Sequence, residues 1–285
     1  MKILILSDKK PGHFNQSIAF AKLKSLEYDV MDISLTPFQK SLSYLLDNLN
    51  IYLNIAKIKL PNTKYNAIVS TGSSTYYVNK YIAKKLGIHS IAIMLPKGFR
   101  LDNFDYILAL EHDNPPKLSN IISLPISLSV SEPKGYIKKA AHPSLGIIIG
   151  GNNSIFTMDK KTIKQELDNI FKNYPNYLKY ITTSRRTTKE IEELINGYRF
   201  DYKLIYSKEP SINPIPDFLD ICDELFITID STSMLSEARA NSNAKLHIIN
   251  LSSQKKDTKF HRLAKNIEKL EGRFDFTPYL KKVKI

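Results

Sequence analysis

Titratable and polar side chains crowd the segment that follows the first apolar run of the chain. Ile3–Leu6 ends at Ser7, and the next residues carry an acid, two amines, an imidazole and two carboxamides: Asp8, Lys9, Lys10, His13, Asn15 and Gln16. A strand, a turn and a helix begin a βαβ unit, and open parallel sheets bind ligands beyond the carboxyl ends of their strands. The segment therefore predicts a ligand-handling loop at a helix N-terminus, which favours anions. The alternative is a polar surface turn in which Ser17 caps the helix.

Two more polar segments follow apolar runs in the second half of the chain. Gly150-Gly151-Asn152 comes after Leu145–Ile149, and Ser184-Arg185-Arg186 comes after Lys179–Thr183. Glycines let backbone amides approach an anion closely, and the asparagine adds a donor. A guanidinium suits phosphate, and adjacent arginines cannot point to one place. One of the two arginines is therefore expected to face a ligand, and the other to brace a loop or contact solvent.

A third polar segment follows Leu225–Ile229 and opens another helical pattern. It carries Asp230, Ser231, Ser233 and Glu237. A helix N-terminus again offers free amides to a phosphate, and a carboxylate further into the helix can accept hydrogen bonds from ribose hydroxyls. Capping by Ser231 or Ser233 explains the same residues without a ligand. Together, the three segments predict that the second half binds a nucleotide-activated ligand, while the first half supplies the other substrate and the catalytic group.

Apolar, β-branched runs alternate with helical patterns along the whole chain. The expected strands are Lys2–Ser7, Tyr28–Ile33, Ala67–Ser70, Ser90–Met94, Tyr106–Ala109, Ile121–Leu124, Leu145–Ile149, Lys179–Thr183, Lys203–Ile205, Leu225–Ile229 and Leu246–Ile249. Helical patterns include Lys161–Phe171, Lys189–Ile195, Met234–Ala240 and Phe260–Leu270. Such alternation is typical of parallel sheets covered on both faces. The sequence predicts an α/β fold of two doubly wound, Rossmann-like domains facing a central cleft.

A proline- and glycine-containing stretch near residues 131–143 predicts the linker between these domains. The expected division is an N-terminal domain, 1–138, and a C-terminal, donor-binding domain, 139–285. One segment of the first domain has an amphipathic pattern that runs from Leu42 to Ile58 and ends in Lys57 and Lys59. Such a pattern is typical of a helix packed on the sheet. The alternative is a helix that lies on a membrane interface.

Composition limits the classes of protein that remain. The chain has 285 residues, of which 42% are hydrophobic and 24% charged, which is typical of a globular protein. No run of about 18 apolar residues predicts a membrane span, and no secretory segment is evident at the N-terminus. The single Cys222 excludes an internal disulfide and a multi-cysteine metal site, and is interpreted as a small core residue.

The net charge of +13 is spread along the chain. Residues 1–140 hold 18 Lys/Arg and 10 Asp/Glu (+8), and residues 141–285 hold 23 and 18 (+5). This distribution suits anionic small molecules or an anionic membrane surface. No RNP or helix-turn-helix motif is present, so nucleic acid is an unlikely partner on sequence grounds.

Five motifs, in this order, resemble those of the mitochondrial-fission ELM-type family. They are Ser7-Asp8-x-Lys10-Pro11-Gly12-His13-x-Asn15-Gln16-Ser17; Phe104-Asp105 with Glu111-His112-Asp113; Gly150-Gly151; Ser184-Arg185-Arg186-Thr187; and Asp230-Ser231-x-Ser233-Met234-x-Ser236-Glu237-Ala238. Bacterial members of that family are similar to GT-B glycosyltransferases. The resemblance implies two Rossmann-like domains and a nucleotide-sugar donor held mainly by the second. Lys9 departs from the glycine expected in the first motif.

These features together predict a metal-independent glycosyltransferase. It would transfer a sugar from a nucleotide-activated donor to a membrane-associated or carbohydrate acceptor in cell-envelope glycan synthesis. Gly151, Asn152 and Arg185 would offset the charge of the leaving group in place of a metal, and no cofactor is expected. Asp8 and His13 are the candidate bases, although a phosphate contact is an equal interpretation of His13. The residues assigned to the acceptor side are Lys10, Asn15, Gln16, Gly72, Ser73 and His112.

Two other functions fit the same residues. A nucleotide-sugar 2-epimerase has the same architecture, and a membrane-docked scaffold would keep the fold without turnover. Retention of the carboxylates and arginines favours an enzyme over a scaffold. The expected location is the cytoplasm, with possible peripheral contact at the inner face of the cytoplasmic membrane.

Overall fold

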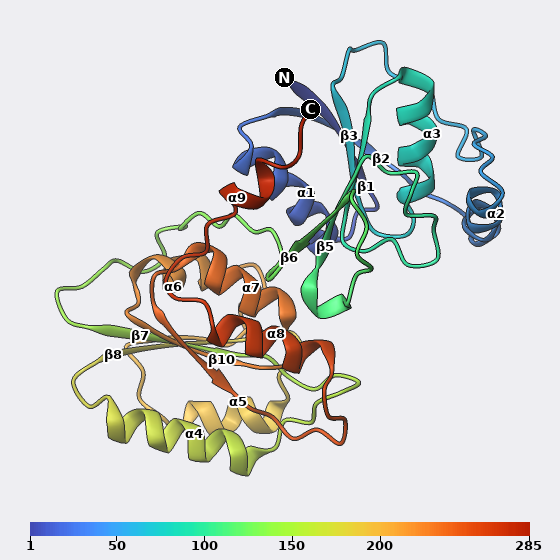
Figure 1. Cartoon of the computed structure of the whole chain (residues 1–285). Coiled ribbons are helices and arrows are strands. Elements are labelled where there is room, and N and C mark those ends of the chain that lie inside the picture. The colour runs from blue at the N-terminus through green and yellow to red at the C-terminus, as the bar shows by residue number, and fades with distance from the viewer. The chain divides into compact units, whose positions relative to one another are not determined.

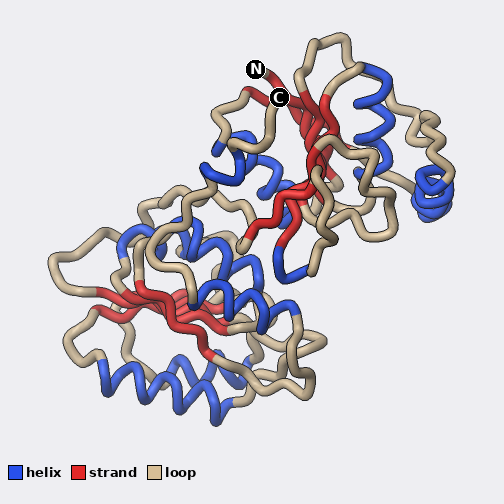
Figure 2. The backbone as a smooth tube through the Cα atoms, viewed as in Figure 1, coloured by secondary structure: helices blue, strands red, loops and turns tan.

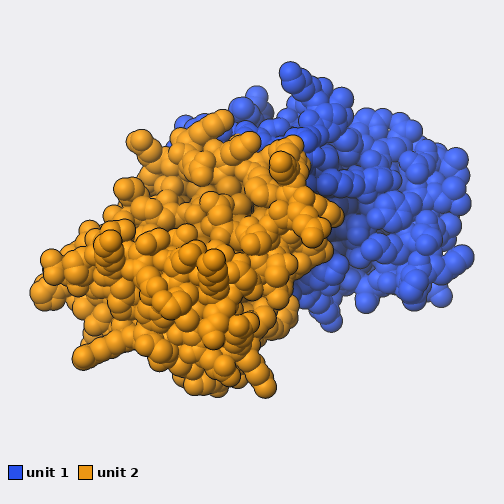
Figure 3. Space-filling view, turned by 90° about the horizontal axis from the view of Figure 1, so that it is seen from below, with its two compact units in different colours: residues 1–130, 275–285 blue, residues 131–274 orange.

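The computed structural model describes all 285 residues, which form two compact units (Figure 3). Unit 1 comprises Met1–Val130 and Asp275–Ile285, and unit 2 comprises Ser131–Phe274. The division therefore lies earlier than the expected 138/139 boundary, and the C-terminal residues return to unit 1. They are held there by Lys24, whose Nζ donates to the carbonyl oxygens of Leu280 (3.0 Å) and Val283 (2.9 Å).

Unit 1 is built on a six-stranded parallel sheet of order β2-β1-β3-β4-β5-β6. Its strands are β1 (Lys2–Ser7), β2 (Glu27–Asp32), β3 (Ala67–Thr71), β4 (His89–Ile93), β5 (Tyr106–Leu110) and β6 (Ile121–Leu124). Its helices are α1 (Pro11–Leu23), α2 (Pro37–Asn48), α3 (Tyr76–Leu86), the short 3₁₀ helix η1 (Glu111–Asp113) and α9 (Thr277–Leu280). Helices α1 and α3 cover opposite faces of the sheet (Figure 1).

Unit 2 has a five-stranded parallel sheet of order β11-β10-β7-β8-β9. Its strands are β7 (Ser144–Ile149), β8 (Leu178–Thr183), β9 (Tyr202–Leu204), β10 (Glu224–Thr228) and β11 (Lys245–Ile249). Its helices are α4 (Lys160–Asn173), α5 (Lys189–Asn196), α6 (Ile215–Ile221), α7 (Thr232–Asn241) and α8 (Lys259–Glu268). Helices α4 and α5 lie on one face and α6, α7 and α8 on the other, with the strands as the middle layer (Figures 1 and 2).

The prediction of two doubly wound α/β units is confirmed. Each of the eleven expected strands overlaps an observed strand, and their ends differ by no more than one residue. The pattern is readable because the central strands are buried on both faces. Every residue of β3 and of β7, for example, is buried. A parallel sheet between two helical layers requires such continuous apolar runs.

Two elements differ from the sequence-based expectation. Helix α1 already begins at Pro11, whose fixed φ suits the first helical position; Ser17 is therefore not a cap but a buried residue bonded to Thr71 Oγ1 (2.8 Å). The expected amphipathic helix is also shorter. Helix α2 ends at Asn48, since Asn50 takes a left-handed conformation (φ +59°) that terminates helices. Helix α2 packs against α3 rather than on the sheet.

The stretch expected to be a linker is anchored in unit 2. The buried carboxylate of Asp217 accepts hydrogen bonds from four successive backbone amides, those of residues 134–137. Cys222 is buried as expected, and burial raises the pKa of its thiol to about 12. No helix of the structure has both the length and the apolarity needed to cross a membrane.

Candidate functional site

Each sheet has one point where its strand order reverses direction. In unit 1 this point lies between β1 and β3, and in unit 2 it lies between β7 and β10. The helices that follow such a pair of strands leave toward opposite faces, which opens a crevice beyond the carboxyl ends of the strands. The polar segments beginning at Asp8, Gly150 and Asp230 follow three of these four strands. The fold therefore places the predicted residues where doubly wound sheets bind ligands.

At the switch point of unit 1, Asp8 and His13 form a hydrogen-bonded pair. His13 Nδ1 lies 2.9 Å from Asp8 Oδ2 and 3.2 Å from Asp8 Oδ1. The Asp8 side chain is only 4% exposed, whereas that of His13 is 25% exposed. A carboxylate that accepts from Nδ1–H fixes the tautomer and leaves Nε2 as an acceptor. Nε2 has no partner in the protein, so the pair has the arrangement of a general base and its orienting group.

Gly72, directly after β3, forms the floor under this pair. Its φ of +97° is a conformation that favours glycine, and a Cβ at this position would lie 2.4 Å from His13 Nδ1. The turn before α1 contains a second left-handed residue, Lys9 (φ +63°). Lysine thus adopts the conformation that the family motif assigns to glycine, and the turn remains tight.

The other residues assigned to the acceptor side are spread more widely. Lys10 lies 3.7 Å from Asp8 Oδ2, so its amine borders the pair. Asn15 is exposed on α1, while Gln16 donates to Gly12 O and points its buried Oε1 inward. Ser73 follows Gly72 and is partly exposed, whereas His112 is 3% exposed within η1, beyond β5. The structure therefore brings together Asp8, Lys10, His13 and Gly72, and leaves His112 two strands away from β3.

At the switch point of unit 2, the buried carboxylate of Asp230 joins the ends of β7, β8 and β10. Its Oδ2 accepts from Arg186 Nη2 (2.7 Å) and from the amide of Gly151 (3.0 Å). Close packing explains both glycines: a Cβ on Gly150 would lie 2.2 Å from the Asp230 carboxylate, and one on Gly151 would lie 2.1 Å from Arg186 O. The expectation that one arginine braces a loop is met by Arg186.

The glycine amides are not free for a ligand in this arrangement. The amide of Gly150 donates to Thr228 Oγ1 (2.8 Å), and that of Gly151 donates to Asp230. The groups that remain available are others. Arg185 is exposed and has no partner, and Asn152 is exposed with only its Oδ1 engaged, by the amide of Met158. Anion binding by the glycine segment stays a prediction, with the exposed Arg185 and Asn152 as its donors.

Helix α7 begins beside these residues. Its N-cap is Ser231, whose side chain accepts from the amide of Met234 (3.3 Å), as the capping interpretation predicted. The first amides of a helix have no partner within the helix, so those of Thr232 and Ser233 remain open to an anion. Ser233 is itself exposed, and Ser184 caps the β8 turn by accepting from the amide of Arg186 (3.1 Å).

Glu237 lies further along α7 in a largely buried position. Its Oε1 accepts from Ser131 Oγ (3.1 Å), at the start of unit 2. Burial raises the pKa of this carboxyl, and the hydrogen bond from Ser131 opposes that shift. A contact between Glu237 and ribose hydroxyls stays a prediction.

The sequence matches a known protein family over most of its length. The model of the family described as Mitochondrial fission ELM1 matches residues 11–283. This chain belongs to that family. No curated protein sequence matches it. The ELM1-family match covers nearly the whole chain, which agrees with the series of motifs that runs from the first strand to α7.

Several solved structures have a fold similar to that of this chain. A putative UDP-N-acetylglucosamine 2-epimerase from Listeria monocytogenes superposes with a TM-score of 0.56 at 10% identity, over 94% of this chain and 81% of that one. Acinetobacter baumannii MurG gives 0.48 at 12% identity over 93% and 82%. Heptosyltransferase II from E. coli gives 0.48 at 11% identity over 94% and 99%. At such identity, the Listeria structure supports the fold of this ELM1-family member.

Two residues of this ELM1-family site were not among the predicted site residues. Thr187 Oγ1 donates to Gly150 O and accepts from the amide of Ser184, so it links the ends of β7 and β8. Asn153 Nδ2 donates to Asp230 O (3.0 Å). Both residues stand inside polar segments that the sequence singled out. The signal for their role was their position directly after a buried strand.

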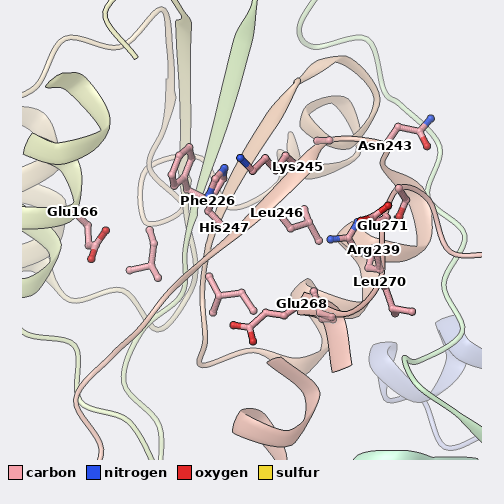
Figure 4. A pocket seen from close by; sticks show the side chains of 15 residues that line it. Glu166, Phe226, Arg239, Asn243, Lys245, Leu246, His247, Glu268, Leu270 and Glu271 are labelled. Carbon is pink, nitrogen blue, oxygen red and sulfur yellow. The ribbon is translucent and has the colours of Figure 1, made fainter. Parts of the chain in front are cut away.

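A pocket of about 740 Å³ opens beside the edge strand β11 of unit 2. Its lining includes Lys245 and His247 of β11, Arg239 of α7 and Glu268 at the end of α8 (Figure 4). None of the predicted site residues lines it. No three His, Cys, Asp or Glu side chains of the structure are grouped so as to hold a metal ion.

The ion pair between the buried Asp230 and the partly exposed Arg186 is expected to couple the two residues energetically. Asp230→Asn should lower the free energy of unfolding by about 3 kcal/mol, because it leaves Arg186 without its counter-ion. Arg186→Gln should cost a similar amount, and the double variant less than the sum of the two. Urea unfolding of the four proteins measures the coupling. The exposed Lys164–Asp168 pair is the control, with an expected coupling near 0.5 kcal/mol; equal coupling in both cycles would contradict a structural role for Asp230.

The raised pKa of Glu237 predicts a pH-dependent stability. Above its ordinary value of 4.5, the unfolded chain loses this proton before the folded one, so stability falls as the pH rises toward the folded-state pKa. Glu237→Gln keeps the acceptor for Ser131 and removes the charge. It should melt at a higher temperature than the parent at pH 8, with a difference that disappears by pH 4. Melting curves of Glu237→Gln and of the exposed Glu193→Gln control test this; a difference that grows on acidification would refute it.

Proposed function

We propose that this ELM1-family chain is a metal-independent glycosyltransferase that uses a nucleotide-activated sugar. Unit 2 would bind the donor, and Asp8 with His13 of unit 1 would activate a hydroxyl of a membrane-associated or carbohydrate acceptor in cell-envelope glycan synthesis. The observation that carries the proposal is the position of both polar clusters at the switch points of their own sheets. We expect the protein to act at the inner face of the cytoplasmic membrane.

In the proposed reaction, the acceptor oxygen attacks the anomeric carbon of the donor sugar, and the bond to the nucleotide phosphate breaks. His13 Nε2 takes the hydroxyl proton, while Asp8 holds the imidazole in position and stabilises the imidazolium that forms. The departing phosphate gains negative charge. Arg185 and the open amides of α7 would offset that charge, since donors fixed in place stabilise developing charge without reorganisation.

Calorimetry with UDP, ADP, GDP and CMP tests donor binding directly. The parent should bind at least one of them, and Arg185→Ala should weaken that binding by about tenfold or more, because a charged hydrogen bond is lost. The matched control is Arg199→Ala, an exposed arginine of unit 2 that the proposal does not use. Absence of binding to every nucleotide, or equal affinities for both variants, would reject the donor assignment.

Epimerisation is the second candidate, since the Listeria protein of similar fold is described as a putative 2-epimerase. The two reactions differ in their need for an acceptor. Product analysis of the nucleotide sugar incubated with the chain alone separates them. A 2-epimer formed without acceptor favours epimerisation, and an unchanged sugar favours transfer.

A further inference from the structure

Helix α2 of unit 1 packs Leu46 into the core, but it leaves a stripe of apolar side chains exposed and buries two polar ones. Phe38, Leu45 and Leu49 are 75%, 57% and 59% exposed. Their spacing of seven and four residues places them on one stripe of the helix. On the opposite side, Ser43 and Asp47 are completely buried. A surface helix of a globular protein has the reverse pattern, so the apolar stripe calls for a partner outside the unit.

Polar contacts fix the rotation of this helix. Asp47 pairs with Lys80 Nζ of α3 at 2.7 Å and also accepts from the amide of Arg100 at 2.7 Å. Rotating α2 to bury its apolar stripe would leave Asp47 and Lys80 unpaired, which is strongly unfavourable in a buried place. The exposure of Phe38, Leu45 and Leu49 is therefore built into the fold.

The chain after α2 folds back along the helix and extends the apolar area. The side chain of Gln39, near the start of α2, donates to Ile55 O (2.8 Å), and Tyr77 OH donates to Ile51 O (3.1 Å). Ile51 and Leu53 of this segment are 42% and 55% exposed. We use the name α2 surface for the exposed apolar residues Phe38, Leu45, Leu49, Ile51 and Leu53. In Figure 1, α2 lies on the outer side of α3, away from the sheet of unit 1.

The sequence around the α2 surface is strongly basic. Between Ile33 and Leu101 the only acidic residue is Asp47, which is buried and paired. The same stretch contains the basic residues Lys40, Lys57, Lys59, Lys64, Lys80, Lys84, Lys85, Lys97 and Arg100. Lys80, Lys97 and Arg100 are paired with Asp47, Asp113 and Asp102, and the other six leave an uncompensated positive charge along the segments that flank the apolar area. Two copies that met through this surface would bring like charges together, so the charge favours an anionic occupant.

We propose that the α2 surface docks unit 1 on an anionic lipid bilayer. The apolar side chains would enter the boundary between headgroups and acyl chains, and the neighbouring lysines would contact lipid phosphates. Docking of this kind requires no sugar transfer. It also deepens the proposed function, resting on it only for the statement that a lipid-linked acceptor would be met there.

Vesicle sedimentation of the full chain tests the proposal. The parent should bind vesicles of phosphatidylcholine with phosphatidylglycerol, bind pure phosphatidylcholine much more weakly, and be released by high salt. Leu45→Asp/Leu49→Asp should weaken binding by more than about tenfold, because two leucines that would enter the bilayer are lost. Tyr136→Asp, which alters an exposed aromatic of unit 2 (48% exposed), should bind like the parent. Equal binding to charged and uncharged vesicles would overturn the proposal. An equal loss of vesicle binding in Leu45→Asp/Leu49→Asp and in Tyr136→Asp would also overturn it.

A second experiment measures insertion of the α2 surface into the bilayer without introducing charged residues. The chain has no tryptophan, so Phe38→Trp introduces a single fluorescent reporter at a position that is already exposed. Its emission should shift to the blue on anionic vesicles, and that of Tyr136→Trp should not. An unshifted Phe38→Trp spectrum would contradict docking through α2.

Sedimentation velocity tests whether a second copy of the chain covers the α2 surface instead. If the parent is a dimer that does not bind vesicles, and if Leu45→Asp/Leu49→Asp dissociates that dimer, the α2 surface is a contact between two copies. Since these assays contain no nucleotide sugar, their failure is distinguishable from failure of the proposed reaction.

Discussion

Gly151→Ala is expected to destabilise unit 2 by more than about 3 kcal/mol and to lower its melting temperature by roughly 10 °C or more. The new Cβ would lie 2.1 Å from Arg186 O and 2.8 Å from Arg186 Cβ. Backbone at such a distance cannot turn aside as the end of a flexible side chain can. Moving it would also disturb the pairing of Arg186 with Asp230. Gly150→Ala should behave alike, since its Cβ would meet the Asp230 carboxylate.

Thermal melting followed by circular dichroism measures this effect. Gly12→Ala is the control, because no atom lies within 4 Å of a Cβ at that position and alanine favours the helix in which it stands. It should melt at or slightly above the temperature of the parent. Similar melting temperatures for Gly151→Ala and Gly12→Ala would mean that the turns after β7 and β8 separate easily. The Asp230-centred network would then not be a rigid part of the site.

His13→Ala is expected to lower the turnover of sugar transfer by about a thousandfold while leaving donor affinity close to that of the parent. The reason is the free Nε2 of an imidazole whose other nitrogen is held by Asp8 at 2.9 Å. Asp8→Asn should also lower turnover, since an amide nitrogen facing Nδ1 favours the wrong tautomer. Turnover and donor affinity are measured separately, with a donor chosen from the calorimetric panel.

The comparison of the two quantities distinguishes the roles of His13. A fall in donor affinity with little change in turnover would identify His13 as a phosphate contact, the other interpretation that the sequence left open. The control is His142→Ala, which changes an exposed histidine of unit 2. If His13→Ala transfers sugar within threefold of this control, the proton acceptor is another group.

Much of the fold was predictable because buried parallel strands carry an unmistakable pattern. Strands such as β3 and β7 are apolar on both faces, and their ends are marked by polar residues. Helix limits were harder to predict. The pattern from Leu42 to Ile58 remains amphipathic beyond Asn48, yet the chain turns at Asn50 because a left-handed residue ends the helix. Periodicity reports which side chains can share a face, and it does not report where the backbone stops following that face.

The orientation of α2 shows a second limit of sequence patterns. Its apolar stripe would normally predict the face that packs on the protein. The buried pair of Asp47 and Lys80 turns part of this apolar face outward, and the two partners are 33 residues apart in the sequence. No local pattern announces such a pair, since each residue by itself is typical of an exposed helix.

The sequence by itself determined the two successive α/β units, the polar strand ends and the family motifs. These properties are local, because the burial of each strand and the chemistry of each turn depend on residues that are neighbours in the sequence. Only the tertiary structure decided that Arg186, rather than Arg185, pairs with Asp230, that Gly72 lies beneath His13, and that the C-terminal residues return to unit 1. The first two depend on which strands become neighbours in a sheet, and the third depends on the contacts of Lys24 with the last residues of the chain. Strand order follows from packing of the whole chain, and not from any one segment of it.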